Sequence, residues 1–275
     1  MKNVFKAMAI AMVASVVLYS CTSEEITSSE DISPAMMALI TDAGFDVANQ
    51  APIVFEDGFL IEGDIYLTEG QLREMSHGHR IPVAEQYSTN NLVSTGGSRN
   101  ITIYVPTGRR GFSAGMIAGF DEAISRYNAE NLEITFSRTT NRNADISVSR
   151  LKRRDERQGI LGSAGFPTNS GDPFGSIQMS GILESSFGLS TDGIATIFAH
   201  ELGHCIGFRH TDYFDRSISC GGGTANEGDA GIGANLIPGT PAGASLAAAS
   251  WMLACTDGSD RPFNNDDQTA LDFLY

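Results

Sequence analysis

The sequence predicts an α+β fold in which a small mixed, twisted sheet accompanies two long helices, followed by an irregular C-terminal part and a closing helix. Two observations support this prediction. Apolar and polar residues alternate in several short segments between residues 101 and 182, which is the period of half-buried strands. Two longer segments, 113–127 and 193–206, repeat apolar residues at helical spacing. Because strands and helices are interspersed, we expect the helices to cover one sheet.

The elements of this domain, expected to span residues 98–275, can be assigned in order. Residues 101–105 alternate and stop at Pro106, so they are expected to form a strand. Ser113 is a candidate cap for the first long helix, and Thr191 or Asp192 for the second. The remaining expected elements are strands at 132–137, 144–149 and 176–182, and the closing helix within 264–275.

The chain before residue 98 is expected to be organised differently. Residues 1–20 place two lysines ahead of a short apolar run, which is typical of a signal peptide. The run ends at LYSC, which resembles the lipobox of bacterial lipoproteins and would make Cys21 a lipidation site. Residues 21–97 are expected to be an acidic tether and a propeptide or N-terminal subdomain, closing on the polar linker YSTNNLVSTGGSRN. We therefore expect an exported bacterial envelope lipoprotein, which contacts the membrane only through this anchor.

Charge and cysteine content narrow the choice of partners and bonds. The net charge of −15 argues against nucleic acid, because phosphate binding requires a basic face. The basic run at 150–157 is expected to be a solvated loop, with a processing or docking site as the alternative. If Cys21 is lipidated, Cys205, Cys220 and Cys255 can form one disulfide in three ways. We favour Cys220–Cys255, because both residues lie in the non-helical C-terminal part.

The segment HELGHCIGFRH, residues 200–210, holds three of the five histidines. On a helix, His200 and His204 lie one turn apart on the same face, and Glu201 can reach a water on a shared ion. Gly207 can end the helix in a left-handed conformation, which lets His210 turn back towards the other two. Three neutral imidazoles with an open fourth position predict one catalytic zinc ion rather than a closed structural site.

These positions fill the pattern HExxHxxGxxH, which is the zinc signature of metzincin metalloendopeptidases. The segment SWMLAC adds Met252, at the distance at which metzincins carry a methionine in a turn below the zinc. Together with HELGHCIGFRHTD, this segment most resembles the bacterial dual-action HEIGH metallopeptidases, over residues 98–275. Astacins and serralysins have a zinc-binding tyrosine two residues after the methionine, where this chain has Ala254, so a tyrosine switch is excluded.

The resemblance implies a metzincin-like fold and a monomeric zinc endopeptidase that acts on proteins or peptides. A zinc-activated water would attack the peptide bond, with Glu201 as general base. The substrate would lie antiparallel to an edge strand, expected at Ser176–Ile182. The alternative is a zinc-containing surface adhesin that binds without cutting, although such a binder does not need Glu201.

The segment Ile61-Glu62-Gly63-Asp64 resembles the F-x-G-D motif of astacin propeptides, with Ile in place of the aromatic residue. In those propeptides the aspartate occupies the zinc site in reverse orientation. The resemblance implies a zymogen in which Asp64 caps the zinc until cleavage within 80–99, with Arg80 and Arg99 as candidate sites. The alternative is an ordinary Gly-Asp turn before a strand.

Overall fold

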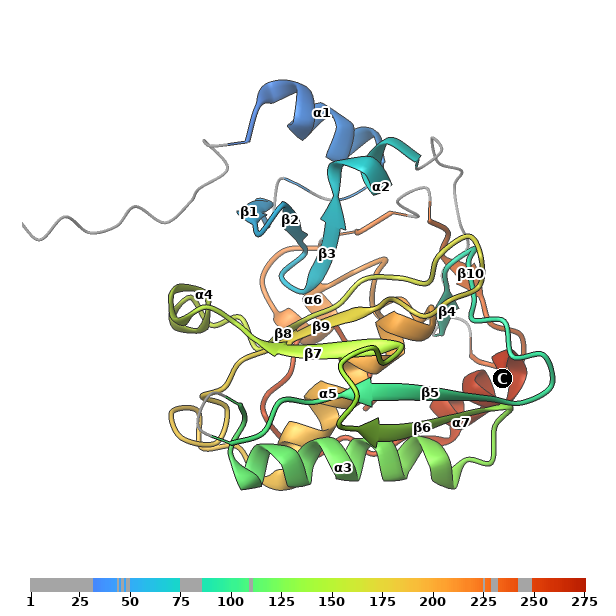
Figure 1. Ribbon diagram of the computed structural model, residues 1–275. Coiled ribbons are helices and arrows are strands. Elements are labelled where there is room, and N and C mark those ends of the chain that lie inside the picture. Colours follow the sequence, from blue (N-terminus) through green and yellow to red (C-terminus); the bar gives the residue numbers. More distant parts are fainter. Residues whose placement is uncertain are drawn as a thin grey trace, which may run out of the picture.

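The structure, a computed structural model, describes residues 32–275 except 44, 46, 48–49, 75–85, 109–110, 225, 229–231 and 242–248 (Figure 1). The predicted signal peptide, Cys21 and Arg80 lie outside the described residues. The described chain mixes small sheets with several helices, which confirms the predicted α+β class.

The largest sheet has five strands in the order β6-β5-β7-β9-β8. All neighbouring strands in it are parallel except β8 and β9, which run antiparallel. Alternate residues of the longer strands are buried, as the sequence pattern predicted; Ile101 and Ile103 of the central strand are examples. The strands are β5 (Arg99–Tyr104), β6 (Ile134–Thr139), β7 (Ile146–Arg150), β8 (Gly162–Ser163) and β9 (Ser176–Met179).

The two longest helices are α3 (Ala114–Ala129) and α5 (Thr191–Ile206). A single hydrophobic core joins both helices to the buried face of the five-stranded sheet. The hydroxyl of Ser113 caps α3, as predicted. The expectation for α5 was wrong: its cap is Ser190, whose hydroxyl accepts from the backbone N–H of Gly193, rather than Thr191 or Asp192.

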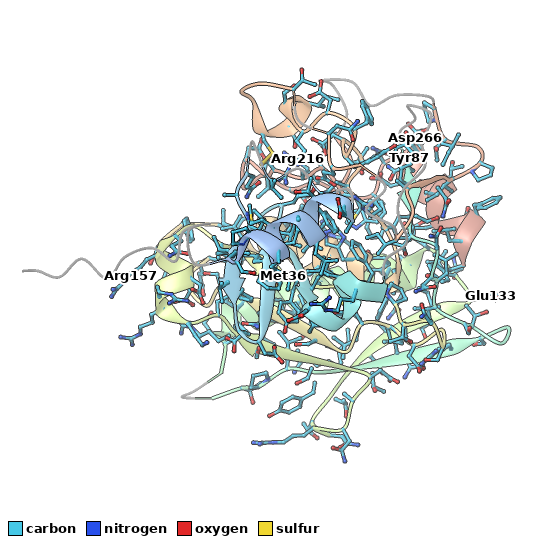
Figure 2. The ribbon with its side chains drawn as sticks, turned by 90° about the horizontal axis from the view of Figure 1, so that it is seen from above. Met36, Tyr87, Glu133, Arg157, Arg216 and Asp266 are labelled. Atoms are coloured by element: carbon cyan, nitrogen blue, oxygen red, sulfur yellow. A yellow bond between two sulfur atoms is a disulfide. The ribbon has the colours of Figure 1, made fainter. Side chains whose placement is uncertain are left out.

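Residues 32–74 form a separate layer above this core, with α1 crossing the middle of the face seen in Figure 2. The layer has its own apolar cluster, which also includes Phe166 of the larger part. Hydrogen bonds of 2.9 and 3.1 Å join Tyr66 N to Ala164 O and Ala164 N to Asp64 O. The elements are α1 (Pro34–Asp42), the sheet of β1 (Ile53–Phe55), β2 (Gly58–Ile61) and β3 (Ile65–Thr68), and α2 (Glu69–Glu74).

The stretch expected to be a polar linker is instead part of the larger body. Tyr87 is fully buried and belongs to β4 (Tyr87–Ser88), which pairs with β10 (Asn235–Leu236). Thr89 N donates to Gly207 O, and Arg209 N donates to Tyr87 O. The polar composition of this stretch suggested a linker. Its backbone groups, however, form hydrogen bonds with segments more than a hundred residues away in the sequence.

The expected edge strand at Ser176–Ile182 is also wrong. Strand β9 has β7 on one side and, at Gln178 and Met179, β8 on the other, so β8 is the strand at that border of the sheet. Residue Ala164, directly after β8, pairs with Ile65 in a parallel bridge. The N-terminal layer therefore lies along this border.

The remaining described helices are α4 (Arg153–Arg157), α6 (Ser217–Cys220) and α7 (Asn265–Leu274). The basic run expected to be a loop contains α4, and Arg150 forms an ion pair of 2.8 Å with the buried Glu156. In the part of the chain that the structure describes, no helix has the length and hydropathy needed to cross a bilayer.

Candidate metal centre

Helix α5 sets the first two histidines side by side. His200 and His204 lie one turn apart, and their ring centroids are 4.7 Å from each other. The helix ends at Gly207, whose φ of 108° is the left-handed conformation predicted for it. The chain then turns back, which places the ring of His210 at 5.2 Å from that of His200 and 4.9 Å from that of His204.

Each imidazole is held through its Nδ1 atom. Nδ1 of His200 lies 2.9 Å from Trp251 O, and Nδ1 of His204 lies 2.9 Å from Phe208 O. Because a carbonyl oxygen can only accept, both Nδ1 atoms carry a proton, and in a neutral ring this leaves the lone pair on Nε2. The Nε2 atoms of both residues are buried without a hydrogen-bond partner among the described residues. This is the tautomer that a metal ligand requires.

His210 is held by a carboxylate instead of a carbonyl. Its Nδ1 lies 2.7 Å from Oε1 of the fully buried Glu227. Burial opposes the charge of Glu227, yet His210 and two nearby arginines hold the pKa of this carboxyl at about 2. Glu227 is therefore ionised, and it orients His210 and increases the basicity of its ring.

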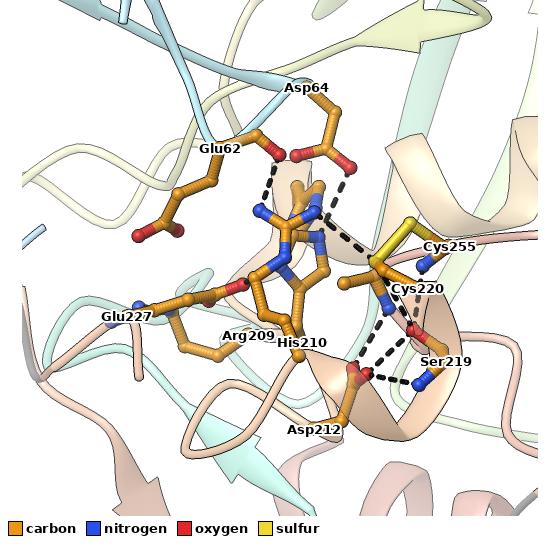
Figure 3. Close-up of polar contacts among 12 residues, drawn as sticks. Glu62, Asp64, Arg209, His210, Asp212, Ser219, Cys220, Glu227 and Cys255 are labelled. Carbon is orange, nitrogen blue, oxygen red and sulfur yellow. Dashed lines mark hydrogen bonds and ion pairs between the residues drawn. A yellow bond between two sulfur atoms is a disulfide. The ribbon is translucent and has the colours of Figure 1, made fainter. Parts of the chain in front are cut away.

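Asp64 closes the site from the N-terminal layer, as Figure 3 shows. Its Oδ2 lies 3.1 Å from His210 Nε2 and 3.4 Å from His200 Nε2. One ligand atom from each of Asp64, His200, His204 and His210 can be chosen so that all lie within 4.8 Å of one another. Glu62 and Gly63, with φ of 56° and 95°, form the sharp turn that presents Asp64 to the histidines.

This donor set fits a zinc ion. Zinc prefers imidazole nitrogens and carboxylate oxygens in a four-coordinate arrangement, and the site offers three of the former and one of the latter. Burial and the two other histidines hold the pKa of His204 well below its usual range, so this ring is neutral. The nearby histidines hold the pKa of Asp64 well below its usual range despite its burial, so its carboxylate is ionised.

Glu201 lies beside this site on the next position of the helix. Its side chain is buried, and its Oε2 has no hydrogen-bond partner in the described part of the chain. Burial, and then the charge of Asp64, raise the pKa of Glu201 well above its usual range. A Cβ at Gly162 would lie 2.2 Å from Glu201 Oε1, so the glycine of β8 makes room for this carboxyl group.

Met252 lies directly beneath the helix, as the sequence suggested. A Cβ at Gly203 would lie 2.5 Å from Met252 Sδ, so only glycine allows this close approach. The neighbouring backbone is also part of the site: Trp251 O accepts from His200, and Met252 O accepts from Thr211 N. The turn thus fixes the helix and the loop of the third histidine together.

A disulfide and a buried aspartate attach α6 to the same turn. Cys220 and Cys255 form the disulfide that the sequence analysis favoured, and Cys205 is a buried free thiol. Asp212, fully buried, accepts from Ser219 and from Ala254 N. Asp212, two residues after His210, therefore links α6 to the chain after Met252.

Sequence reasoning missed a group of charged residues around His210. Arg209 and Arg216 both approach Glu227, at 3.4 and 3.5 Å. Arg216 also donates to the main-chain oxygen of Glu62, at 2.7 Å. Burial, and then the charge of Glu227, raise the pKa of Glu62 well above its usual range, so its side chain is neutral. Their spacing in the sequence carries no periodic signal, and the only cue in the sequence is the arginine directly before His210.

A cavity of about 240 Å³ opens beside His200 and Glu201. One wall is formed by the chain after Met252, and residues 159–162 form another part of the lining. The N-terminal layer contributes Glu62, Gly63 and Asp64 to its lining. The cavity therefore lies between the metal centre and the segment that covers it.

A protein family and solved structures are similar to this chain. The structure of myroilysin matches with a TM-score of 0.30 and 15% identity, over 43% of this chain and 46% of that chain, so this chain spans about half of that protein. No curated protein matches. The sequence pattern described as dual-action HEIGH metallo-peptidase matches residues 59–275, a range that contains Asp64, the three histidines and Met252. The chain therefore belongs to the family of dual-action HEIGH metallo-peptidases.

Proposed function

We propose that the protein is a zinc-dependent endopeptidase with one catalytic ion, held by His200, His204 and His210. The observation that carries the proposal is the shared arrangement of the three rings, with every Nδ1 bound to an acceptor and one ligand atom of each ring within 4.8 Å of the others. A zinc ion bound there would lower the pKa of a coordinated water and polarise the carbonyl of the peptide.

Glu201 is proposed as the general base. Glu201 is not one of the proposed metal ligands. One oxygen of its buried carboxyl group has no hydrogen-bond partner in the described part of the chain. Its raised pKa suits a group that takes a proton from water and returns it to the leaving amine. Burial is the larger cause of that raised pKa, and Asp64 adds to it, so removal of Asp64 lowers the pKa of Glu201.

The test compares Glu201→Gln with the wild type and with Glu122→Gln, a change on helix α3 outside the metal centre and the cavity lining. We expect protein freed of residues 32–74 by limited proteolysis to digest casein and a peptide library. Glu201→Gln should lower kcat by at least about a hundredfold with unchanged zinc content, as for loss of a general base. Digestion by neither wild type nor variant would support the non-catalytic adhesin instead.

We also propose that the N-terminal layer keeps the enzyme latent. Asp64 lies where a substrate and its attacking water would have to be, and Ile65 pairs in parallel with Ala164. Peptide substrates of metzincins are expected to lie antiparallel to the edge strand. The layer runs in the opposite direction, so it occupies the border of the sheet without presenting a cleavable bond. Arg216, which binds Glu62 O, helps to hold the turn in place.

The latency proposal is tested with the chain from residue 22 before any processing. We expect Asp64→Ala to be at least about tenfold more active than the wild type, because one charge-assisted contact is lost. Asp42→Ala, an exposed change in the same layer, should have no effect. Equal activity of the unprocessed wild type and Asp64→Ala would refute latency.

The retained enzyme is proposed to start at or before Gln86. Residues 86–91 hold the loop of the third histidine, and Gln86 donates to Asp267 at 2.5 Å. Cleavage at Arg99 would cut β5 next to its pairing with Ile134, so this candidate site is not supported. Export as a lipoprotein through Cys21 remains part of the proposal, and radiolabelled palmitate incorporation into Cys21→Ala and wild type tests it.

A further inference from the structure

The cavity beside Glu201 has an uneven distribution of charge between its two parts. Among the described residues that line it, the acidic ones are Glu62, Asp64 and Glu201. The first two belong to the N-terminal layer. The arginines in the lining, Arg216 and Arg261, both belong to the part of the chain that would remain after processing. Removal of the layer therefore leaves two guanidinium groups and Glu201.

Arg216 is held in place by neighbours that do not leave with the layer. Its Nε lies 3.5 Å from Glu227, and its Nη2 lies 3.7 Å from the sulfur of Cys220 in the disulfide. Its side chain is 9% exposed. Its Nη1 donates to Glu62 O, which is a peptide oxygen of the covering segment. The direction of this Nη1 towards the cavity is therefore fixed, while its acceptor is the group that processing removes.

The balance of charge around Arg216 changes with the layer. Arg209 and Arg216 both approach the buried Glu227, at 3.4 and 3.5 Å. In the covered protein Asp64 is another acidic group near Arg216. Removal of the layer takes Asp64 away and leaves the guanidinium of Arg216 in place, so the positive potential on this side of the cavity increases.

Arg261 is the second guanidinium of the lining. Its Nη1 donates to Cys255 O at 2.9 Å, and its contact with the exposed Asp257 is 3.4 Å long. It lies on the wall formed by the chain after Met252, so it adds positive potential to the same cavity. A guanidinium is well suited to bind a carboxylate through paired hydrogen bonds.

We propose that this cavity selects an acidic side chain in the residue next to the cleaved peptide bond, with Arg216 as the specificity-determining residue. The inference deepens the proposed peptidase function and rests on it. An aspartate or glutamate of the substrate would take the place that the main-chain oxygen of Glu62 holds in the covered protein, and its carboxylate would accept from the guanidinium of Arg216. Arg261 would add to the attraction without direct contact.

The first experiment profiles the processed wild-type enzyme with a mixed peptide library and mass spectrometry. We expect Asp or Glu to be enriched at one position that adjoins the cleaved bond. The second measures kcat/KM for two peptides that differ only in Glu or Gln at that position. We expect the Glu peptide to be preferred by roughly tenfold to a hundredfold, as for one charge-assisted hydrogen bond.

The variants assign this preference to Arg216. Arg216→Gln should remove the Glu-over-Gln preference, Arg216→Lys should retain part of it, and Arg261→Gln should weaken it only slightly. The ratio of the two kcat/KM values within one preparation does not depend on how much of the variant is folded. If Arg216→Gln cannot be purified, Arg216→Lys and the wild-type ratio at low and high salt decide the question.

The outcomes separate the inference from the function on which it rests. Cleavage without an acidic preference, or an equal loss of activity on both peptides in Arg216→Gln, would overturn the specificity role while the peptidase function stands. An equal loss would show that Arg216 binds the substrate main chain. Absence of any cleavage by the processed wild type would overturn the proposed function, and the inference with it.

Discussion

At the scale of single residues, the three histidines differ in what holds them. His200 and His204 donate to main-chain carbonyls, whereas His210 donates to the ionised Glu227. A carboxylate partner makes the ring a stronger electron donor than a carbonyl partner does. The third ring comes from a loop rather than from α5, so it also depends more on this partner for its orientation.

The first prediction follows from this difference. Glu227→Gln should weaken zinc affinity about tenfold to a hundredfold, because the ring of His210 loses its charged acceptor and part of its orientation. Chelator competition measures this change, and circular dichroism reports whether the variant is folded. His204→Ala should lose zinc outright and Glu122→Gln should match the wild type. Unchanged affinity in Glu227→Gln would show that the loop alone orients His210.

At the scale of elements, the sequence predicted the parts of the site that depend on local spacing. The positions of His200 and His204 on one helix face and the end of the helix at Gly207 follow from helix geometry alone. The approach of Met252 to Gly203 and the contact of His210 with Glu227 do not, since each joins segments whose order in space is set by the whole fold. Strand β8 has two residues and no alternation to detect.

Helix α7 gives a second example of a contact that spacing does not reveal. The sequence predicted the helix and its Asn or Asp caps, and the capping box of Asn264 and Asp267 is present. However, Asp267 is also fully buried and accepts a hydrogen bond from Gln86, which lies before the sheet. Burial raises the pKa of Asp267 to about 7.

The second prediction concerns the effect of this carboxyl group on stability. The ordinary pKa of Asp is 3.8, so between that value and about 7 the folded protein keeps a proton that the unfolded chain has released. The contribution of Asp267 is therefore complete below pH 3.8 and is lost as the pH rises to about 7. The loss is on the order of 4 kcal/mol in the free energy of unfolding.

Asp267→Asn provides the measurement, because Asn has a similar shape and no proton to release. Urea unfolding at several pH values should show the wild type losing stability relative to Asp267→Asn as the pH rises. Asp272→Asn, an exposed change on the same helix, should follow the wild type at every pH. A constant difference between Asp267→Asn and the wild type would mean that Asp267 is ionised in the fold throughout this range.

At the scale of the whole molecule, two N-terminal segments play different parts. Residues 32–74 cover the metal centre through Asp64 and the turn before it, yet their apolar cluster is largely their own. Residues 86–91 instead pair with the backbone around Gly207 and Arg209. A Cβ at Gly207 would lie 2.9 Å from a side-chain atom of Leu92, so the chain directly after this segment also packs against the end of α5.

The last prediction compares chains that begin at residues 86 and 98. The chain from residue 86 should fold and bind zinc, because it keeps all the contacts that support the loop of His210. The chain from residue 98 loses Tyr87, which is fully buried and packs edge-on against Tyr213 with ring centroids 4.3 Å apart. Loss of one such aromatic side chain costs about 3–5 kcal/mol, a large share of the stability of a domain.

The chain from residue 98 also leaves Asp267 without the amide of Gln86 and Gly207 O without its donor. We therefore expect it to be unfolded or free of zinc at 25 °C, as measured by thermal unfolding and metal analysis. The variant Tyr87→Phe in the longer chain is the matched control and should keep both fold and zinc. A stable, zinc-bound protein that starts at residue 98 would show that residues 86–97 are dispensable. The catalytic domain would then start at residue 98, as expected from the sequence.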